Sequence, residues 1–383
     1  MAYGQALNDA YALDGRDPSS VVGVQWCHGL FDRPFHPPAP ILGLVRQRDS
    51  RTHMSRLDMD AYRAHTDRPA CETDQPIVVL GAGLAGAVAA RLLADHGFDV
   101  VVLDKGRRVG GRCSRRALDD VVVTHGANHV HDRPEWMAAW MDAENIETNI
   151  ESEEDTLRLV DGPETIAGWL EGIDVVNGVT VTRVEQADGA WHVHDDEGNR
   201  WEAAGVIVTA PLPQLHRIMP EAPEAWSDHP YRPTWSVVLA SQTLPPKGLS
   251  RILEGVGLEV EQSDGTTGAV VHFSHDWSAT NLEAERADVV EAFMEMTANV
   301  EQDVRRWLMS ASCQAHRWRY GRAAALGIRS KLPRLVEAGD AWAEPAGTGG
   351  AALRSGAWAA AHIAWQCSQH LRPTSAPVQQ TLF

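Results

Sequence analysis

Three glycines with the spacing of a dinucleotide-binding turn, Gly81, Gly83 and Gly86, directly follow the apolar run Ile77–Leu80. A strand that ends in such a turn and opens into a helix points free backbone N–H groups and the positive end of the helix dipole at one place. The first glycine makes the turn, the second lets a phosphate approach the backbone, and the third lets the helix pack on the strand. The spacing therefore predicts a pyrophosphate site.

The residues after this turn fit a strand–helix–strand unit. Residues 85–94 are good helix formers with small or apolar side chains, and Phe98–Leu103 is typical of a buried strand. Asp104 ends this strand about 20 residues after Gly83, where an acid accepts hydrogen bonds from ribose hydroxyl groups and repels a 2′-phosphate. The unit therefore predicts a dinucleotide other than NADP.

Two further segments favour a flavin dinucleotide over a nicotinamide one. Gly110–Arg112 makes a second glycine turn in a basic segment, and a guanidinium suits bidentate contact with phosphate. The segment Thr124–His129 combines glycine with small polar residues after a short apolar strand, so its backbone can come close to a ring system. Because its guanidinium lies in the second glycine turn, we expect Arg112 to contact the cofactor.

These segments resemble the amino-terminal FAD module shared by monoamine oxidases and renalases, through the stretches GAGLAG, VVVLDK, GGR and HGANH. Val271–Ser278 and Ala315–Tyr320 are similar to stretches of renalase-like proteins, and Glu337–Asp340 with Gly350–Gly356 looks like the closing FAD element of that family. The resemblance covers about residues 75–365. It implies a renalase-like FAD-dependent oxidoreductase of the flavin amine oxidase superfamily.

The resemblance also implies where the cofactor is held. The acid of the closing element would approach the ribityl or pyrophosphate part of FAD, the helix start near Ala351 and Ala352 would face the pyrimidine edge of the flavin, and Val181 matches the residue whose backbone meets the adenine. No cysteine lies in the closing motif, so we expect non-covalent FAD. The predicted cofactor-binding residues are Gly81, Gly83, Leu84, Ala85, Gly86, Asp104, Lys105, Gly111, Arg112, Gly126, Ala127, Asn128, His129, Val181, Gly339, Asp340, Ala351 and Ala352.

Departures from the family pattern leave the substrate open. Thr124 stands where the family often has Asp, His129 where a phenol is usual, and Gly350–Ala351 where Glu-Gly is common. Neither Lys247 nor Lys331 matches the lysine that such enzymes often hold near the flavin. We therefore assign no catalytic side chain.

Some aromatic and imidazole groups have two interpretations. Trp318 and, with less support, Trp277 are candidates for stacking on a flat substrate, core packing being the alternative. His316 is expected to be structural, and no metal site is expected because no group of residues has ligand spacing.

Composition narrows the class of protein. The 383 residues can bury a large core in two domains, and a formal net charge of −18 argues against a nucleic-acid partner. The sequence shows neither an uncharged apolar run of about eighteen residues nor a signal-peptide pattern, so we expect a cytoplasmic protein without a membrane partner. Five cysteines without CxxC spacing indicate reduced thiols.

The pattern predicts an α/β fold, with a Rossmann-type FAD-binding domain interleaved with a mixed α+β substrate domain. Within the latter, residues 288–308 are expected to form one long helix. Met54 and Met59 are candidate alternative starts, because the FAD module needs nothing before about residue 76. The expected segments are an irregular extension (1–75), FAD-binding parts (76–132, 164–219 and 316–370), a helical connection (133–163), the substrate domain (220–315) and a tail (371–383).

Three functions remain open from the sequence. The first is an oxidase that takes a hydride from a reduced nicotinamide-like or amine small molecule and passes the electrons to O2, giving H2O2. The second is an FAD-dependent dehydrogenase or desaturase of a secondary metabolite with another electron acceptor. The third is a non-enzymatic flavin-binding protein. Neither the substrate nor the oligomeric state follows from the residues.

Overall fold

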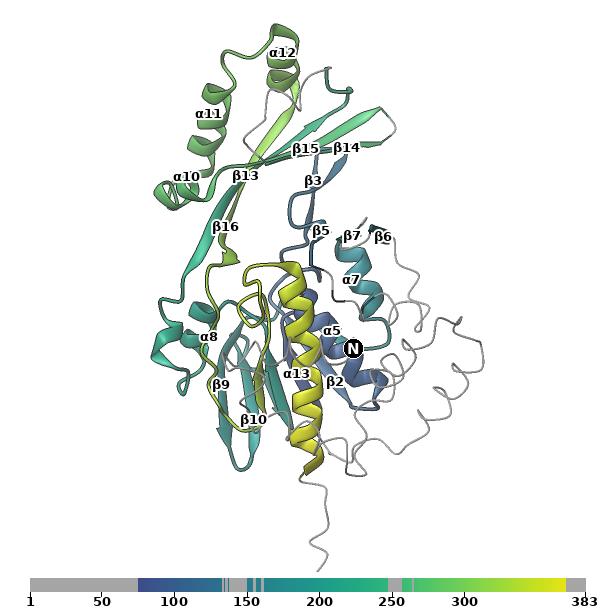
Figure 1. Cartoon of the computed structure of the whole chain (residues 1–383), viewed down its shortest axis with the longest axis vertical. Helices are drawn as coiled ribbons and strands as arrows, with labels where there is room; N and C mark the ends of the chain where they lie inside the picture. Colours follow the sequence, from purple (N-terminus) through teal and green to yellow (C-terminus); the bar gives the residue numbers. More distant parts are fainter. Residues whose placement is uncertain are drawn as a thin grey trace, which may run out of the picture.

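The computed structural model of this chain describes residues 75–369, apart from 133, 135–136, 138–149, 154–155, 160–161, 247–256 and 264. The extension expected before residue 75, residues 138–149 of the expected helical connection and the tail at 371–383 lie outside the described residues. The later part of that connection is not helical throughout, because it contains strands at Ile150–Glu153 and Thr156–Leu159. The described residues form two lobes, which Figure 1 shows one above the other. No helix among them is both long and apolar enough to cross a membrane.

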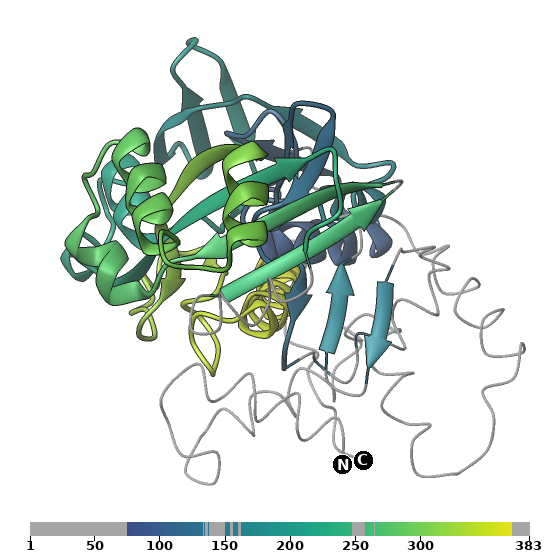
Figure 2. The ribbon, with the colours of Figure 1, turned by 90° about the horizontal axis from the view of Figure 1, so that it is seen from above.

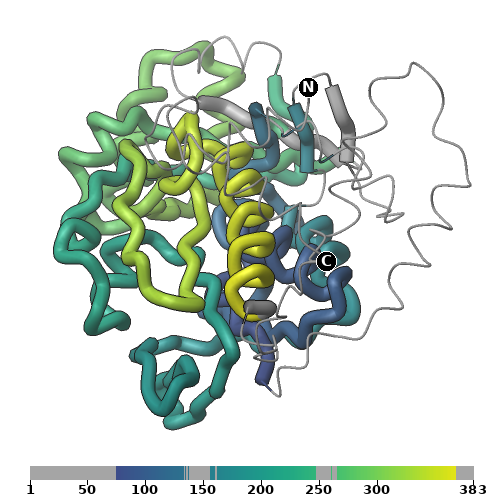
Figure 3. The backbone as a smooth tube through the Cα atoms, turned by 60° about the horizontal axis from the view of Figure 1, so that its bottom comes forward, coloured from purple at the N-terminus to yellow at the C-terminus, as the bar shows by residue number. Residues whose placement is uncertain are grey.

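A five-stranded parallel sheet forms the centre of the lower lobe, in the order β17-β12-β1-β2-β8. Its strands are β1 (Ile77–Leu80), β2 (Val100–Asp104), β8 (Asp174–Asn177), β12 (Gly205–Val208) and β17 (Leu335–Glu337). Every residue of β1 and β12 is buried, as expected for parallel strands covered on both faces. On one face lie α5 (Leu84–Asp95) and α13 (Gly349–Gln369), which Figure 3 shows side by side. The predicted strand–helix–strand unit is confirmed.

The other face of the parallel sheet is covered by a three-stranded antiparallel sheet. This smaller sheet consists of β9 (Val181–Ala187), β10 (Ala190–Asp195) and β11 (Arg200–Ala203). Three short helices complete the lobe, namely α7 (Pro163–Trp169), α8 (Leu212–Ile218) and the 3-10 helix Glu224–Trp226. A third sheet lies beside them, formed by β5 (His129–Val130), β7 (Thr156–Leu159) and β6 (Ile150–Glu153).

The upper lobe is built on a four-stranded antiparallel sheet in the order β14-β15-β13-β16. Its strands are β13 (Tyr231–Ser241), β14 (Gly257–Ser263), β15 (Thr266–His272) and β16 (Ser312–Ala323). One face packs against α10 (His275–Thr280), α11 (Arg286–Met296) and α12 (Gln302–Ser310), visible in Figure 2. The last strand, β16, runs through the expected domain boundary between residues 315 and 316.

The expected single helix over residues 288–308 is wrong, because two helices occupy this segment. The first ends at Thr297, whose Oγ1 donates a hydrogen bond to the Phe293 carbonyl 3.0 Å away. Glu301 then takes an extended conformation and begins the second helix. The intervening Thr-Ala-Asn-Val sequence contains β-branched residues and Asn, which are weak helix formers. The amphipathic pattern continued through these residues, but their local preference ends the helix.

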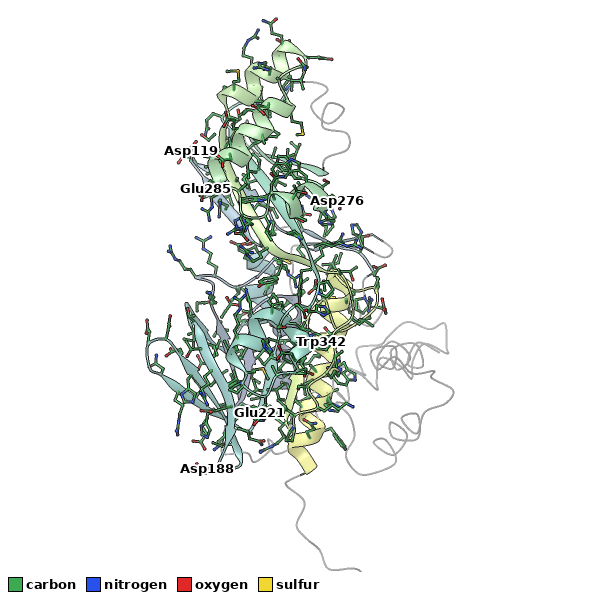
Figure 4. All side chains as sticks on the ribbon, turned by 90° about the vertical axis from the view of Figure 1, so that its left-hand side faces the viewer. Asp119, Asp188, Glu221, Asp276, Glu285 and Trp342 are labelled. Carbon is green, nitrogen blue, oxygen red and sulfur yellow. The ribbon has the colours of Figure 1, made fainter. Side chains whose placement is uncertain are left out.

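A two-stranded hairpin from the first FAD segment joins the lobes. Strands β3 (Arg115–Leu118) and β4 (Val121–Thr124) pack Val121 and Val123 on the second face of the upper sheet. Figure 4 shows Asp119, at the hairpin turn, in the upper lobe, away from Glu221 in the lower lobe. The hairpin therefore carries the residues that follow β4 to the boundary between the two lobes.

Candidate functional site

The start of α5 is open to an anion. Gly83 caps the helix without a side-chain hydrogen bond, and the first turn holds no acidic residue. The backbone N–H groups of residues 83–86 have no hydrogen-bond partner among the described residues. Such orphan donors, together with the helix dipole, favour a bound negative group.

The glycines of this turn divide into two kinds. A Cβ on Gly81 would lie 2.3 Å from Thr209 Oγ1, and a Cβ on Gly86 would lie 1.8 Å from the Gly81 carbonyl oxygen, so the protein itself requires both glycines. A Cβ on Gly83 would meet nothing closer than the Gly111 Cα at 4.0 Å. The φ of Gly83 is −84°, which any residue adopts. A Cβ on Gly111 would lie 3.3 Å from the Gly83 Cα, so the two glycine turns contact each other, and no other residue covers the Cβ position of Gly83 within 4 Å. That uncovered side of Gly83 fits a ligand that approaches the backbone closely.

Asp104 holds the glycine turn from the neighbouring strand. Its Oδ2 accepts a hydrogen bond from the Ala82 N–H, and its Oδ1 accepts one from the Gly106 N–H, both at 2.6 Å. A carboxylate has about four acceptor positions, so the two remaining positions can accept ribose hydroxyl groups as predicted. Lys105, the next residue, is exposed.

Arg112 and Asp340 form a bidentate ion pair that links the two ends of the site. Arg112 Nη1 and Nη2 lie 2.8 and 2.7 Å from the two carboxylate oxygens. Asp340 also accepts the Ala323 N–H, and Arg112 donates to the Gly321 carbonyl. Burial alone favours the neutral form of each group, but the opposite charge and the hydrogen bonds outweigh it, which raises the pKa of Arg112 and lowers the pKa of Asp340.

The segment after β4 is folded against the second glycine turn. Ala127 N–H donates to the Arg112 carbonyl, and a Cβ on Gly126 would lie only 2.0 Å from that oxygen. Asn128 is 8% exposed, and its Oδ1 lies 2.6 Å from Nδ1 of the exposed His129. Gly126 therefore serves contact between two protein segments, whereas Ala127 and His129 are accessible to a ligand.

The start of α13 presents other donors than the two predicted. Ala351 N–H donates to Thr348 Oγ1, and Ala352 N–H donates to the Thr348 carbonyl, so both are already bonded. The N–H groups of Gly349 and Gly350 have no hydrogen-bond partner among the described residues. The helix start can therefore still stabilise negative charge, through the residues just before those predicted.

The remaining predicted residues lie around the same turn. Leu84 and Ala85 are buried in the first turn of α5. Val181 begins β9, two residues after Val179, whose N–H donates to the Asp104 carbonyl. Gly339 has a φ of +130° and donates its N–H to Ser355 Oγ. The structure thus gathers segments from four separated parts of the chain at the glycine turn.

Sequence reasoning missed a polar row on the upper sheet. His272 on β15 and His316 on β16 both pair directly with Ser236 on the central strand β13. Directly paired residues have side chains on the same face, and Ser236 Oγ lies 2.8 Å from His272 Nδ1. Alternation of Thr234 and Ser236 with apolar neighbours in β13 was the available signal. We call His272, Ser236 and His316 the polar row.

Two aromatic rings extend this row. The ring of His125, which directly follows β4, lies 4.7 Å from the His316 ring and stacks at 5.3 Å on Trp318. The Trp318 and His316 rings are 4.3 Å apart. Trp277, in contrast, stacks on Phe273 against the core on the other face of the sheet. The structure thus separates the two tryptophan candidates, and Trp318 is the one beside the polar row.

Acid is expected to destabilise the fold through His125, which is 3% exposed. Burial, followed by the electrostatic effects of His316 and of the positively charged Arg116, lowers the pKa of His125 to about 3. The unfolded chain takes up this proton first as the pH falls through about 6.5, so the stability contribution is complete above that pH and is lost toward pH 3. We expect a loss of about 2 kcal/mol between pH 6.5 and pH 5, measured by urea unfolding.

The variant His125→Gln removes this titration and should flatten the stability curve over the same interval. His131→Gln is the matched control, because His131 is exposed. Equal slopes for the His125→Gln variant and the unmodified protein would contradict the role assigned to His125.

Comparison with known sequences supports the nucleotide-binding part. An NAD(P)-binding Rossmann-like domain family matches residues 79–143. The zeta-carotene-forming phytoene desaturase of Myxococcus xanthus is 54% identical over 43 residues, which are 11% of this chain and 8% of that protein. Pseudooxynicotine dehydrogenase of Pseudomonas sp. is 29% identical over 191 residues, 50% of this chain and 32% of that protein. The chain thus matches less than a third of the length of these two relatives.

Comparison with solved structures extends the likeness to the whole fold. Cyclohexylamine oxidase from Brevibacterium oxydans superposes with a TM-score of 0.57 at 11% identity, covering 78% of this chain and 100% of that one. Identity at this level shows the fold alone, and it confirms the predicted α/β fold class with a Rossmann-type domain. Residues 79–143 are therefore similar to an NAD(P)-binding Rossmann-like domain, and the chain shares its fold with an amine oxidase.

Proposed function

We propose that this chain is an FAD-dependent oxidoreductase of the amine oxidase superfamily. Within that superfamily we propose a renalase-like oxidase, which removes a hydride from a reduced nicotinamide-like or amine small molecule and uses O2 as electron acceptor, giving H2O2. The observation that carries the cofactor assignment is the uncovered side of Gly83 at the uncapped start of α5. The fold comparison supports FAD, and the resemblance in residues 271–278 and 315–320 supports the oxidase.

The described residues suit a bound FAD in distinct ways. The N–H groups of residues 83–86 would hold its pyrophosphate, and Asp104 would accept ribose hydroxyl groups. The N–H groups of Gly349 and Gly350 would face negative charge at the edge of the ring. FAD supplies a ring that accepts a hydride at N5. The protein then has to orient the donor and keep water away, for which the partly exposed Trp318 ring, already stacked on His125, is the candidate.

A dehydrogenase or desaturase is the second candidate, and two of the sequence relatives favour it. A pseudooxynicotine dehydrogenase matches half of this chain, and a phytoene desaturase matches 43 residues of it at 54% identity. Such an enzyme would use the same cofactor site and would orient its donor with the same Trp318. It would differ in passing electrons to an acceptor other than O2.

An anaerobic absorption spectrum separates these candidates. The purified protein is expected to show the two-band flavin spectrum and to lose it when isomeric dihydronicotinamide dinucleotides or a panel of amines are added. Admission of air should restore the bands and give one H2O2 per donor oxidised if the protein is an oxidase. Slow recovery in air with rapid recovery on adding a redox dye would favour the dehydrogenase. A protein that stays colourless after incubation with FAD contradicts the cofactor assignment.

A further inference from the structure

The basic group beside the polar row is Arg116 on β3. Its Nη1 donates to Gln314 Oε1 at 2.7 Å, and its Nη2 lies 3.1 Å from His316 Nδ1. An arginine can only donate, so this His316 nitrogen accepts and the imidazole is uncharged. Burial, followed by the positive charges of Arg116 and Arg286, also lowers the pKa of His316 to about 4. Both acceptors of Arg116 are therefore neutral, and its positive charge is not compensated by them.

The carboxylates of Asp340, Glu283 and Asp119 have partners other than Arg116. Asp340 is paired with Arg112, and Glu283 with Arg317 and Arg319. Asp119, at the turn of the same hairpin, accepts a hydrogen bond from the Ser312 hydroxyl. In the part of the chain that the structure describes, Arg116 forms no ion pair with an acidic residue.

The polar row lies beside the proposed cofactor site. Arg112 Nη1 donates to the Gly321 carbonyl on β16, and His316 lies on the same strand. Five residues of an extended strand span about 16 Å. His125 links the two places, because its N–H donates to the Ser114 carbonyl just after the second glycine turn. A donor molecule that extends from the polar row along β16 toward Gly321 would therefore reach the cofactor site.

The apolar contact between the β3–β4 hairpin and the upper sheet ends at the polar row. On β13, Val238 and Ala240 pack against the β3–β4 hairpin. Ser236 and Thr234, the next residues on the same face of the strand, do not belong to that apolar cluster. His272, His316 and Trp318 remain partly exposed although they lie on neighbouring strands of this sheet. Partly exposed rings on a sheet face at the lobe boundary provide a flat surface that a planar molecule can cover.

We propose that the polar row, with Trp318 and Arg116, binds the planar electron donor and selects neutral or anionic donors over cationic amines. Trp318 stacks on the ring of the donor, the imidazoles of the row exchange neutral hydrogen bonds with it, and Arg116 attracts a carboxylate or an amide oxygen. A protonated amine meets an uncompensated positive charge there. This inference rests on the proposed function and narrows its substrate class.

Three probes of one shape test the charge preference: benzoate, benzamide and benzylamine. Their dissociation constants are measured on the holoprotein by titration calorimetry and by the change in flavin absorbance. Benzoate and benzamide are expected to bind at least about tenfold more tightly than benzylamine, as one uncompensated charge allows. Arg116→Gln should weaken benzoate about tenfold and benzamide much less, because glutamine loses the charge but keeps an N–H donor for the amide oxygen, whereas Arg116→Lys should keep the preference. Arg217→Gln, at an exposed arginine of α8, is the matched control.

The possible failures are distinguishable. Benzylamine binding as tightly as benzoate, equal loss of all three probes in Arg116→Gln, or absence of benzoate binding overturns the charge selection. Trp318→Leu should weaken all three probes, and an unchanged affinity removes Trp318 from the surface. Calorimetry reports binding without any flavin signal, so a colourless protein that binds benzoate contradicts the cofactor assignment alone. Yellow protein without charge discrimination contradicts this inference alone.

Discussion

Gly83→Ala is expected to give a folded protein that has lost its FAD. The added methyl group meets only the Gly111 Cα at 4.0 Å, and the backbone conformation at residue 83 suits alanine. The same methyl group fills the space in which we place the pyrophosphate, so FAD affinity should fall by about a hundredfold or more, roughly 3 kcal/mol. The measurement is the FAD dissociation constant of the reconstituted protein, with circular dichroism as the check on folding.

Two further glycine variants make this result specific. Gly86→Ala places its methyl group 1.8 Å from the Gly81 carbonyl oxygen and should fail to fold or unfold well below the unmodified protein. Gly168→Ala, in α7, meets nothing within 4 Å and should retain both fold and FAD. If Gly83→Ala binds FAD as well as Gly168→Ala does, the pyrophosphate does not lie at this turn.

Local patterns predicted the nucleotide-binding half well, because its information lies within about 30 consecutive residues. The apolar run 77–80, the glycine spacing and the acid at residue 104 each report on one short strand–turn–helix–strand unit. The structure gives β1, α5 and β2 in those places and adds the reason for each glycine. The contacts at Gly81 and Gly86 agree with the turn and packing roles predicted for them, whereas Gly126, expected to contact the cofactor, is required by its closeness to the Arg112 carbonyl.

The polar row could not be predicted in the same way, because it arises from pairing between strands that are distant in the sequence. His272, Ser236 and His316 come together through the register of β13 with β15 and β16. Each residue alone is an ordinary polar position in a strand, and the register is set by tertiary packing. Arg116 is similar, since its sequence context indicated only a basic loop, whereas the hairpin carries it to Gln314 and His316.

The position of the closing element was predicted correctly, but not all of its contacts were. Its acid and its helix were expected near the cofactor from the family resemblance, and Asp340 and the start of α13 do lie beside the second glycine turn and the segment after β4. The residue-level assignment was less accurate because a helix start exposes only the N–H groups that its own cap leaves unbonded. Thr348 bonds both Ala351 and Ala352, which leaves Gly349 and Gly350.

The ion pair between Arg112 and Asp340 was also not predicted as a pair, although each residue was expected to contact FAD. These residues are 228 positions apart, and their side chains satisfy one another in bidentate geometry. Both are therefore fixed before any ligand binds. Their first role is to hold the second glycine turn against β16 and the closing element.

Arg112→Met is expected to destabilise the protein by about 3 kcal/mol, because it leaves a buried carboxylate without its charge partner. Asp340 is 7% exposed in its side chain, so water cannot replace the lost guanidinium. Asp340→Asn should cost less, since 34% of the Arg112 side chain is exposed and water can solvate part of it. The free energy of unfolding in urea is the measurement. Arg306→Met is the matched control, because Arg306 belongs to a highly exposed ion pair and should change stability little.

The double variant Arg112→Met/Asp340→Asn decides between a pair effect and two separate losses. With both charges removed, no unpaired buried charge remains, so the double variant should be more stable than the sum of the single changes predicts, by about 2 kcal/mol. Additive losses would mean that each residue acts through other contacts, such as the Gly321 carbonyl or the Ala323 N–H. The same three variants also test the proposed FAD site. If the pair positions the second glycine turn, FAD affinity should fall together with stability in Arg112→Met and recover in part in the double variant.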